Sequence, residues 1–355
     1  MITLGSITIT ERTKALMKEA LEKGQVGQTE RIKEFESGMA KFLGVGHAVA
    51  VSNGTMADII SLAVLKHFFP GKDEVIVPAL TFIAHPNSVY FNRLKPIFVD
   101  VGHGMQIDLA ATEKAITEKT LAIMPVHLLG KPAEMGGLRR ISQTHNIPIV
   151  EDACEALGSK YRIPGEEFKL CGTFGAMGCF SFYPSHTITT GEGGMIVTDN
   201  DDYAAMARVL RNHGKKYGDQ FIFDVIGFNA KMNAMEAIVG LGLLPELQEA
   251  INKRNAHYLA LGGAQEVDEF ICPHGLPRLY TDKKTRDEKM VELKKGGIES
   301  RTLFSAIPTQ EKAYAFLGYQ EGDFPVAEDF GNRGLYVPSH QDLIAAEIET
   351  IKVHL

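Results

Sequence analysis

Short hydrophobic runs and longer amphipathic stretches alternate along the first half of the chain. Nearly continuous apolar runs, each of which predicts a buried strand, occupy residues 47–51, 74–78, 95–100, 121–126 and 147–152. Apolar residues at helical spacing lie between these runs, at residues 56–67, 108–116 and 135–143. Strands that are apolar on both faces and alternate with helices predict a parallel sheet with helices on both sides.

Helical patterns also dominate the beginning of the chain and part of its second half. Residues 10–43 predict helix with a break at residues 24–27, and residues 202–210 predict a further helix. A long helix is expected to begin near Asn233 and to continue to about His257. A chain of 355 residues can bury a large core, and this length predicts two domains.

The composition is that of an ordinary globular protein, and it argues against several classes of function. The formal net charge of −7 argues against nucleic acid or an anionic membrane as a partner, although a local basic pocket for phosphate is compatible with it. No apolar run is long enough to span a bilayer, and no secretory signal is visible, so we expect a cytoplasmic protein. The absence of clustered cysteines argues against a metal site, an iron–sulfur cluster or a disulfide framework, because the four present are widely scattered: Cys154, Cys171, Cys179 and Cys272.

Residues suited to ligand binding follow several of the predicted strands. Residues 52–55 (Ser-Asn-Gly-Thr) form a turn between a strand and a helix, and free N–H groups at such a helix start can bind phosphate. Taken alone, a turn of this kind is more often a plain connection than a ligand site. Ligands of parallel sheets bind beyond the carboxyl ends of the strands, where Phe82, His127 and Asp152 fall.

The most informative stretch is residues 180–194, which has the sequence FSFYPSHTITTGEGG. It resembles the cofactor segment of the DegT/StrS sugar aminotransferases, a branch of the aspartate-aminotransferase-like enzymes that use pyridoxal 5′-phosphate (PLP). In that family the motif is approximately S-F-x-x-x-K-x-[IL]-x-x-G-[ED]-G-G, and its lysine bonds covalently to PLP. His186 stands at the lysine position, five residues after Ser181. Residues 151–158 (EDACEALG) are likewise similar to the family pattern E-D-A-A-[QE]-A-x-G.

The resemblance covers nearly the whole chain and implies its fold. We expect the α/β fold of the aspartate aminotransferases (PLP fold type I). A large domain with a mostly parallel sheet would take residues 1–245, and a smaller α/β domain residues 246–355. The opening of the smaller domain is compressed, and residues 277–283 do not show the full strand that the family has there.

The resemblance also assigns residues to the PLP ring. Asp152 is expected to pair with the protonated pyridine nitrogen, Phe82 to stack on the ring, and Glu155 to lie near it. The competing interpretations are a capping residue for Asp152 and a plain core residue for Phe82.

The phosphate and the subunit contact are assigned in the same way. The backbone of Gly54 and Thr55, together with Ser181, would hold the phosphate. Asn229 matches an asparagine that resembles a contact to the cofactor of the neighbouring subunit, which implies a homodimer with shared active sites. No metal is expected.

Histidine in place of lysine changes the expected reaction, because His186 cannot tether PLP. The chain resembles the 3-dehydratases of the family, which act on substrates such as GDP-4-keto-6-deoxymannose and carry histidine there. The resemblance implies that pyridoxamine 5′-phosphate (PMP) and His186 remove the C3 hydroxyl of a nucleotide-linked 4-keto-6-deoxyhexose, and that glutamate restores PMP. Such enzymes serve deoxysugar and lipopolysaccharide biosynthesis. An imidazole with a pKa near neutrality suits this task, because it can accept a proton and return it to the leaving oxygen.

Some 3-dehydratases carry an iron–sulfur cluster on cysteines after the G-E-G-G segment. Residues 199–271 contain no cysteine, so the redox-free, glutamate-dependent type is the better match. Two alternatives remain open. One is a nucleotide-sugar aminotransferase with a native or engineered Lys→His change, and the other is a noncatalytic relative that keeps the fold.

Overall fold

The computed structural model describes residues 1–215 and 222–355, and its centre is a seven-stranded sheet. Bridges between Ile123 and Ile149 and between Val126 and Asp152 join two smaller sheets into one. The strand order is β3 (Lys95–Val99), β2 (Glu74–Pro78), β4 (Thr120–Ile123), β5 (Val150–Asp152), β8 (Met177–Ser181), β9 (Gly194–Thr198) and β1 (His47–Val51). Strand β9 is antiparallel to both of its neighbours, and the other described pairings are parallel. The predicted α/β fold with a mostly parallel sheet is confirmed.

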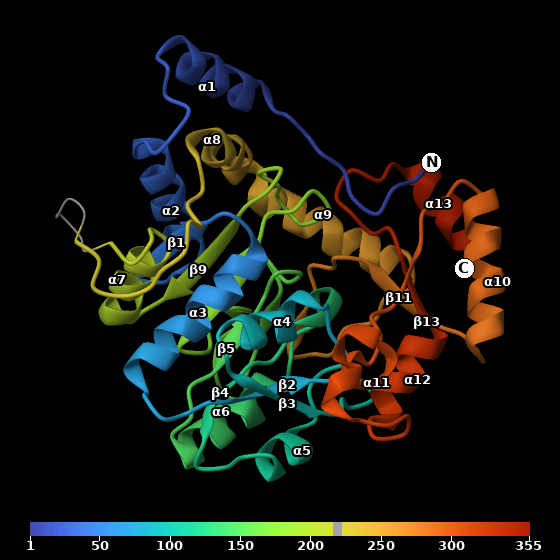
Figure 1. Ribbon diagram of the computed structural model, residues 1–355. Helices are drawn as coiled ribbons and strands as arrows, with labels where there is room; N and C mark the ends of the chain where they lie inside the picture. Colours follow the sequence, from blue (N-terminus) through green and yellow to red (C-terminus); the bar gives the residue numbers. More distant parts are fainter. Residues whose placement is uncertain (216–221) are drawn as a thin grey trace.

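Helices cover both faces of this sheet (Figure 1). Alternate residues of β1 belong to opposite cores, with Val49 and Val51 on one side and Ala48 and Ala50 on the other. The first core is closed by α3 (Gly54–Phe68), α4 (Ala84–Phe91) and α7 (Asp201–Leu210). The second face is closed by α2 (Glu30–Leu43), α5 (Leu109–Lys114), α6 (Met135–His145) and α8 (Ala234–Leu243). This two-sided burial explains why the strands are apolar on both faces.

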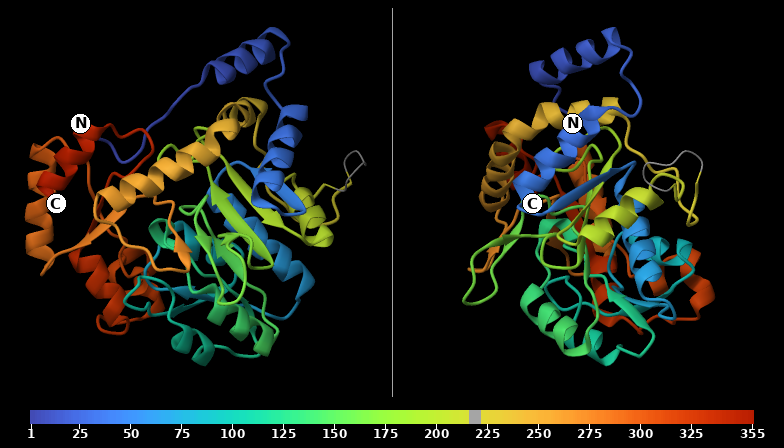
Figure 2. Two further views of the ribbon diagram at one scale, coloured as in Figure 1. Left: turned by 180° about the vertical axis from the view of Figure 1, so that it is seen from behind. Right: turned by 90° about the vertical axis from the view of Figure 1, so that its left-hand side faces the viewer.

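The last third of the chain builds a smaller sheet with its own core. Its strand order is β11 (Leu276–Leu279), β13 (Gly334–Val337) and β12 (Arg301–Thr302), all antiparallel. The helices of this part are α10 (Lys283–Lys295), α11 (Ile307–Gln310), the 3₁₀ turn η3 (Lys312–Leu317), α12 (Pro325–Arg333) and α13 (Ala345–His354). The N-terminus joins the same core, because Ile2 pairs with Ile298 and packs beside Leu335. Both chain ends therefore lie side by side at this part of the molecule (Figures 1 and 2).

The structure refines two expectations about local structure. Residues 277–283 were expected to lack a full strand, and the structure has a short one there, β11, which ends at Leu279 and pairs with β13. The helix expected from Asn233 to about His257 is interrupted, because α8 ends at Leu243 and a 3₁₀ turn (η2, Leu244–Glu246) precedes α9 (Leu247–Ala260). Pro245 lies in that turn, and its missing N–H and fixed φ break the helical hydrogen-bond pattern.

The remaining elements are short or peripheral. Helix α1 (Glu11–Glu22) stands at the rim of the molecule, at the end of an extended segment that starts at the N-terminus (Figure 2). Short pieces complete the structure: β6 (Lys160–Tyr161), β7 (Lys169–Leu170), β10 (Glu269–Phe270) and the 3₁₀ turn η1 (Leu128–Gly130). Across the part of the chain that is described, every helix is too short or too polar to cross a membrane.

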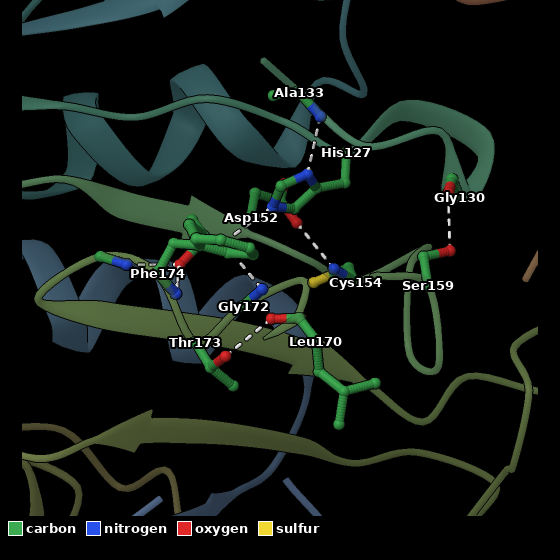
Figure 3. A network of polar contacts seen from close by, with 12 residues as sticks. His127, Gly130, Ala133, Asp152, Cys154, Ser159, Leu170, Gly172, Thr173 and Phe174 are labelled. Atoms are coloured by element: carbon green, nitrogen blue, oxygen red, sulfur yellow. Dashed lines mark hydrogen bonds and ion pairs between the residues drawn. The ribbon is translucent and has the colours of Figure 1, made fainter. Parts of the chain in front are cut away.

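A buried carboxylate holds the centre of the sheet to the loop before β8. Glu151 is fully buried, and its Oε1 accepts hydrogen bonds from the Phe174 and Gly175 N–H groups at 2.6 Å each. Its Oε2 accepts from the Gly172 N–H at 2.8 Å and from His127 Nε2 at 2.9 Å (Figure 3). Because the Ala133 N–H donates to His127 Nδ1, the hydrogen that His127 donates to Glu151 is the one on Nε2. Four donors therefore converge on one carboxylate.

Glu151→Gln is expected to lower the free energy of unfolding by about 2–4 kcal/mol, because either orientation of the amide points its NH₂ at two buried donors. Denaturant unfolding of the cofactor-free protein measures this change. Glu166→Gln, which alters an exposed carboxylate paired with Arg139, is the matched control and should leave stability unchanged. Equal stability of the two variants would contradict the role given to Glu151.

Candidate active site

A cavity of about 240 Å³ lies where the carboxyl ends of β5 and β8 meet the start of α3 and the smaller sheet. The structure brings together at this cavity seven of the eight residues predicted from the sequence: Gly54, Thr55, Phe82, Asp152, Glu155, Ser181 and His186. Asn229 does not line it; this residue is exposed, and its Oδ1 accepts a hydrogen bond from Lys231 Nζ at 2.9 Å.

One end of the cavity has the shape of a phosphate cradle. Asn53 caps α3 by accepting a hydrogen bond from the Met56 N–H at 2.8 Å, and the next N–H groups of a helix start have no partner within the helix. A Cβ at Gly54 would lie 2.7 Å from Ser181 Cβ and 2.9 Å from Cys154 Sγ. Glycine is therefore required for Ser181 to approach the helix start, where the helix dipole favours an anion.

Asp152 lines the cavity from the end of β5. Its side chain is buried, and Oδ1 accepts a hydrogen bond from the Cys154 N–H at 3.0 Å. The structure gives Asp152 no ion pair among the described residues, although His85 lies near it. Burial lowers the pKa of His85 to about 4, so this imidazole is neutral at physiological pH. A carboxylate without a cation in a buried site suits a cationic ring nitrogen.

Phe82 and Glu155 line the same cavity as Asp152. Phe82 is 56% exposed and stands at the edge of the cavity, with its ring centroid 5.9 Å from that of Phe304. Glu155 Oε2 accepts a hydrogen bond from the Leu129 N–H at 2.7 Å. Burial raises the pKa of Glu155 to about 8, and the nearby Asp152 adds to this effect. At neutral pH Glu155 is therefore mostly protonated and can donate as well as accept hydrogen bonds.

His186 faces the cavity together with a second histidine. The ring centroids of His186 and His274 lie 4.9 Å apart, and Nδ1 of each ring is buried without a hydrogen-bond partner. Burial, aided by the charge of Arg254, lowers the pKa of His186 to about 3. The expectation of a pKa near neutrality is therefore wrong for the free site, where His186 is a neutral proton acceptor.

The loop that carries His186 is held from behind by Arg254 of α9. The fully buried guanidinium donates to the carbonyl oxygens of Ser185 (3.2 Å), His186 (2.9 Å) and Pro273 (2.9 Å). Because Pro273 precedes His274, one side chain fixes the backbone beside both histidines. Sequence reasoning did not identify Arg254 or His274, since neither belongs to a recognisable local motif.

Basic residues are scarce around the cavity. Of the described residues that line it, Arg301 from β12 is the one arginine, and there is no lysine. Lys160, Lys169, Lys215 and Lys231 do not line the cavity; Lys231, for example, bonds to Asn212 and Asn229. The anion cradle, the buried carboxylate, the aromatic ring at the edge and the neutral histidine together fit PLP, and none of the described residues lining the cavity is a lysine that could bond covalently to its aldehyde.

Comparisons with known proteins agree with this assignment. The model of the DegT/DnrJ/EryC1/StrS aminotransferase family matches residues 7–355. GDP-perosamine synthase from Caulobacter vibrioides is 37% identical over 335 residues, which cover 90% of this chain and 88% of that protein.

Two solved structures are similar over nearly their full lengths. One is Helicobacter pylori PseC, an aminotransferase of pseudoaminic acid biosynthesis, with a TM-score of 0.91 and 25% identity over 99% of this chain and 97% of that one. The other is E. coli GDP-4-keto-6-deoxy-D-mannose-3-dehydratase with bound hydrated PLP, with a TM-score of 0.89 and 26% identity over 100% and 99%. The chain therefore belongs to the DegT/DnrJ/EryC1/StrS aminotransferase family of PLP-dependent enzymes.

Proposed function

We propose that this protein binds PLP and PMP without a covalent bond and removes the C3 hydroxyl of a nucleotide-linked 4-keto-6-deoxyhexose. The observation that carries the proposal is that His186 lines the cavity, and the motif resemblance assigns it to the position of the family's lysine. No described lysine lines that cavity. The similarity to a 3-dehydratase whose structure contains hydrated PLP supports the same interpretation.

Transamination of a nucleotide-linked keto sugar is the second candidate, and the sequence relatives support it better than dehydration. The relative at 37% identity is a GDP-perosamine synthase, whereas the 3-dehydratase structure is similar at 26% identity. Both reactions need PMP, an amino donor such as glutamate and a base beside the reacting carbon. They differ in whether nitrogen stays in the product.

The residues of the cavity would have separate roles in binding the cofactor and in moving protons. Bound PLP or PMP would supply an electron-withdrawing ring that stabilises the charge developing on the substrate. The Gly54 and Thr55 N–H groups and the Ser181 hydroxyl bind its phosphate, and Asp152 holds a proton on the ring nitrogen.

His186 then accepts a proton and passes it to the departing hydroxyl, which it can do because a weakly basic imidazole releases a proton readily. Bound phosphates would raise the pKa of His186 from its value in the free site and make it a stronger base. The imidazole thus takes both roles, base and acid, within one turnover.

The proposal also covers a second subunit, the nucleotide of the substrate and the place of the enzyme in the cell. Asn229 is exposed and lies outside the cavity of its own chain, which agrees with a contact to the cofactor of a second subunit in a homodimer. Arg301 is suited to bind a phosphate of the nucleotide. We propose a cytoplasmic enzyme of deoxysugar and lipopolysaccharide biosynthesis, with a large domain at residues 1–245 and a small one at residues 246–355.

Borohydride reduction of the PLP-loaded protein should leave the polypeptide mass unchanged, because no lysine among residues 1–215 and 222–355 lines the cavity. His186→Lys is the matched control and should gain the mass of one reduced cofactor. Intact-mass spectrometry separates the two outcomes. A cofactor adduct on the unmodified protein would contradict noncovalent binding.

Asp152→Asn should keep the fold and reduce kcat by roughly 10²–10³-fold, because the ring nitrogen loses the carboxylate that keeps it protonated. Turnover with PMP and a keto sugar, together with the melting temperature of the free protein, provides the test. Near-normal kcat in this variant would show that another group holds the ring proton.

His186→Lys should abolish release of ammonia and of a 3-deoxy sugar, and it should create 4-aminotransferase activity with glutamate, because lysine can move the proton but tethers the cofactor. Product analysis on GDP-, CDP- and dTDP-linked 4-keto-6-deoxyhexoses measures both reactions. If the unmodified protein instead returns a 4-amino sugar with every substrate and releases no ammonia, transamination is its reaction. His186→Asn should be inactive in both assays while still binding PLP.

A further inference from the structure

A second carboxyl group lies beside Asp152 at the floor of the same cavity. Asp58 on α3 is 1% exposed, and its Oδ1 is buried without a hydrogen-bond partner. It lines the cavity together with Asp152 and Cys154. Side-chain ligand atoms of these three residues all lie within 4.8 Å of one another. Asp58 has no role in the reaction proposed above.

The fold explains why the two carboxyls meet. Asp58 follows Gly54 by one helical turn, so it lies on the same side of α3 as the phosphate cradle. In the sheet, Asp152 of β5 is in register with Cys179 of β8. The Cys179 thiol is hydrogen-bonded to Asp58 and lies 3.2 Å from Ser61 Oγ. The surrounding core is apolar, so a buried carboxyl without a hydrogen-bond partner destabilises the folded state there.

Two carboxyl groups this close in a buried site do not both ionise. Burial raises the pKa of Asp58 well above its usual range, and the charge of Asp152 adds to the shift. Because Asp152 Oδ1 already accepts the Cys154 N–H and Asp58 Oδ1 has no donor, the geometry assigns the proton of the pair to Asp58. A protonated Asp58 can donate a hydrogen bond, and a side-chain oxygen of Asp152 lies within 4.8 Å of one of its own.

We propose that Asp58 is a positioning residue for the cofactor: its protonated carboxyl stabilises the Asp152 carboxylate, so that the proton between Asp152 and the pyridine ring stays on the ring nitrogen. This inference rests on the family's PLP chemistry and does not depend on the choice between dehydration and transamination. Without a second donor beside the Cys154 N–H, a buried cation–carboxylate pair is more easily neutralised by transfer of the proton to the carboxylate. The ring would then withdraw electrons less effectively.

Few other groups near the pair change charge between pH 5 and 9. Burial raises the pKa of the thiols of Cys154 and Cys179 well above their usual range, so both stay neutral. His85 from α4, whose pKa is about 4, is also neutral. Glu155 titrates near pH 8 and is therefore replaced by Gln in the background used for the pH series.

The first experiment uses the cofactor-free protein, so it does not depend on activity. The infrared C=O band of a protonated carboxyl should be present at pH 7.5 in the Glu155→Gln background and should be lost on adding Asp58→Asn or Asp58→Leu. The melting temperature gives a second readout. Because the folded pKa of Asp58 exceeds its unfolded value of about 4, its stabilising contribution is complete below that pH and is lost as the pH rises through the folded pKa. The fall in melting temperature with pH should be smaller in both variants.

The second experiment locates the ring proton in the protein loaded with ¹⁵N-labelled PLP. The nitrogen chemical shift should indicate a protonated ring in the unmodified protein and in Asp58→Asn, whose amide can still donate. It should move toward the unprotonated value in Asp58→Leu. Ser61→Ala, a buried change on the same helix, is the control and should match the unmodified protein.

The outcomes separate this proposal from the function above. A protonated ring in Asp58→Leu, or no protonated carboxyl in the free protein at pH 7.5, would overturn the role of Asp58 and leave the proposed reaction untouched. Failure of the unmodified protein to bind PLP would overturn the proposed function, while the infrared measurement would still decide whether Asp58 carries a proton beside Asp152.

Discussion

The convergence of four hydrogen-bond donors on the Glu151 carboxylate is the constraint on which the active-site geometry depends. Three of the donors are backbone N–H groups of residues 172–175, immediately before β8, and the fourth is His127 (Figure 3). Since successive side chains of a strand point to opposite faces, fixing Glu151 on one face directs Asp152 into the cavity on the other. The same contacts hold β8 beside β5, so that Ser181 reaches the start of α3.

A second constraint acts across the cavity. Arg254 reaches from α9 to the carbonyl oxygens beside His186 and His274, and no carboxylate shares its buried site closely. Its charge therefore acts on the neighbouring imidazoles and disfavours their protonated forms. The cavity is therefore lined by two carboxyl groups, Asp58 and Asp152, in one part and by the two neutral histidines in another. Such a distribution suits a cofactor with a cationic ring nitrogen at one end and a proton transfer at the other.

Local sequence pattern was sufficient to predict much of this structure, and long-range contacts account for the rest. The apolar runs of β1 to β4 and the helices between them could be predicted because burial on both faces leaves a continuous hydrophobic signal. Motif similarity placed Gly54, Asp152, Ser181 and His186 around one cavity. Asp58, Arg254 and His274 carry no such signal, because their roles come from residues distant in sequence. The low pKa of His186 was unpredictable for the same reason, since it arises from burial and from Arg254.

The pairing of Ile2 with Ile298 means that the polypeptide crosses between the two sheets more than once. The chain starts in the core of the smaller sheet, leaves along the extended segment that precedes α1, and returns through α9 (Figures 1 and 2). A domain that two polypeptide segments connect to the rest of the protein has fewer possible rotations than a domain that one linker connects. The smaller sheet, which brings Arg301 and Tyr336 to the cavity, is thereby attached to the rest of the molecule at two points, and this limits the directions in which it could rotate relative to the large sheet.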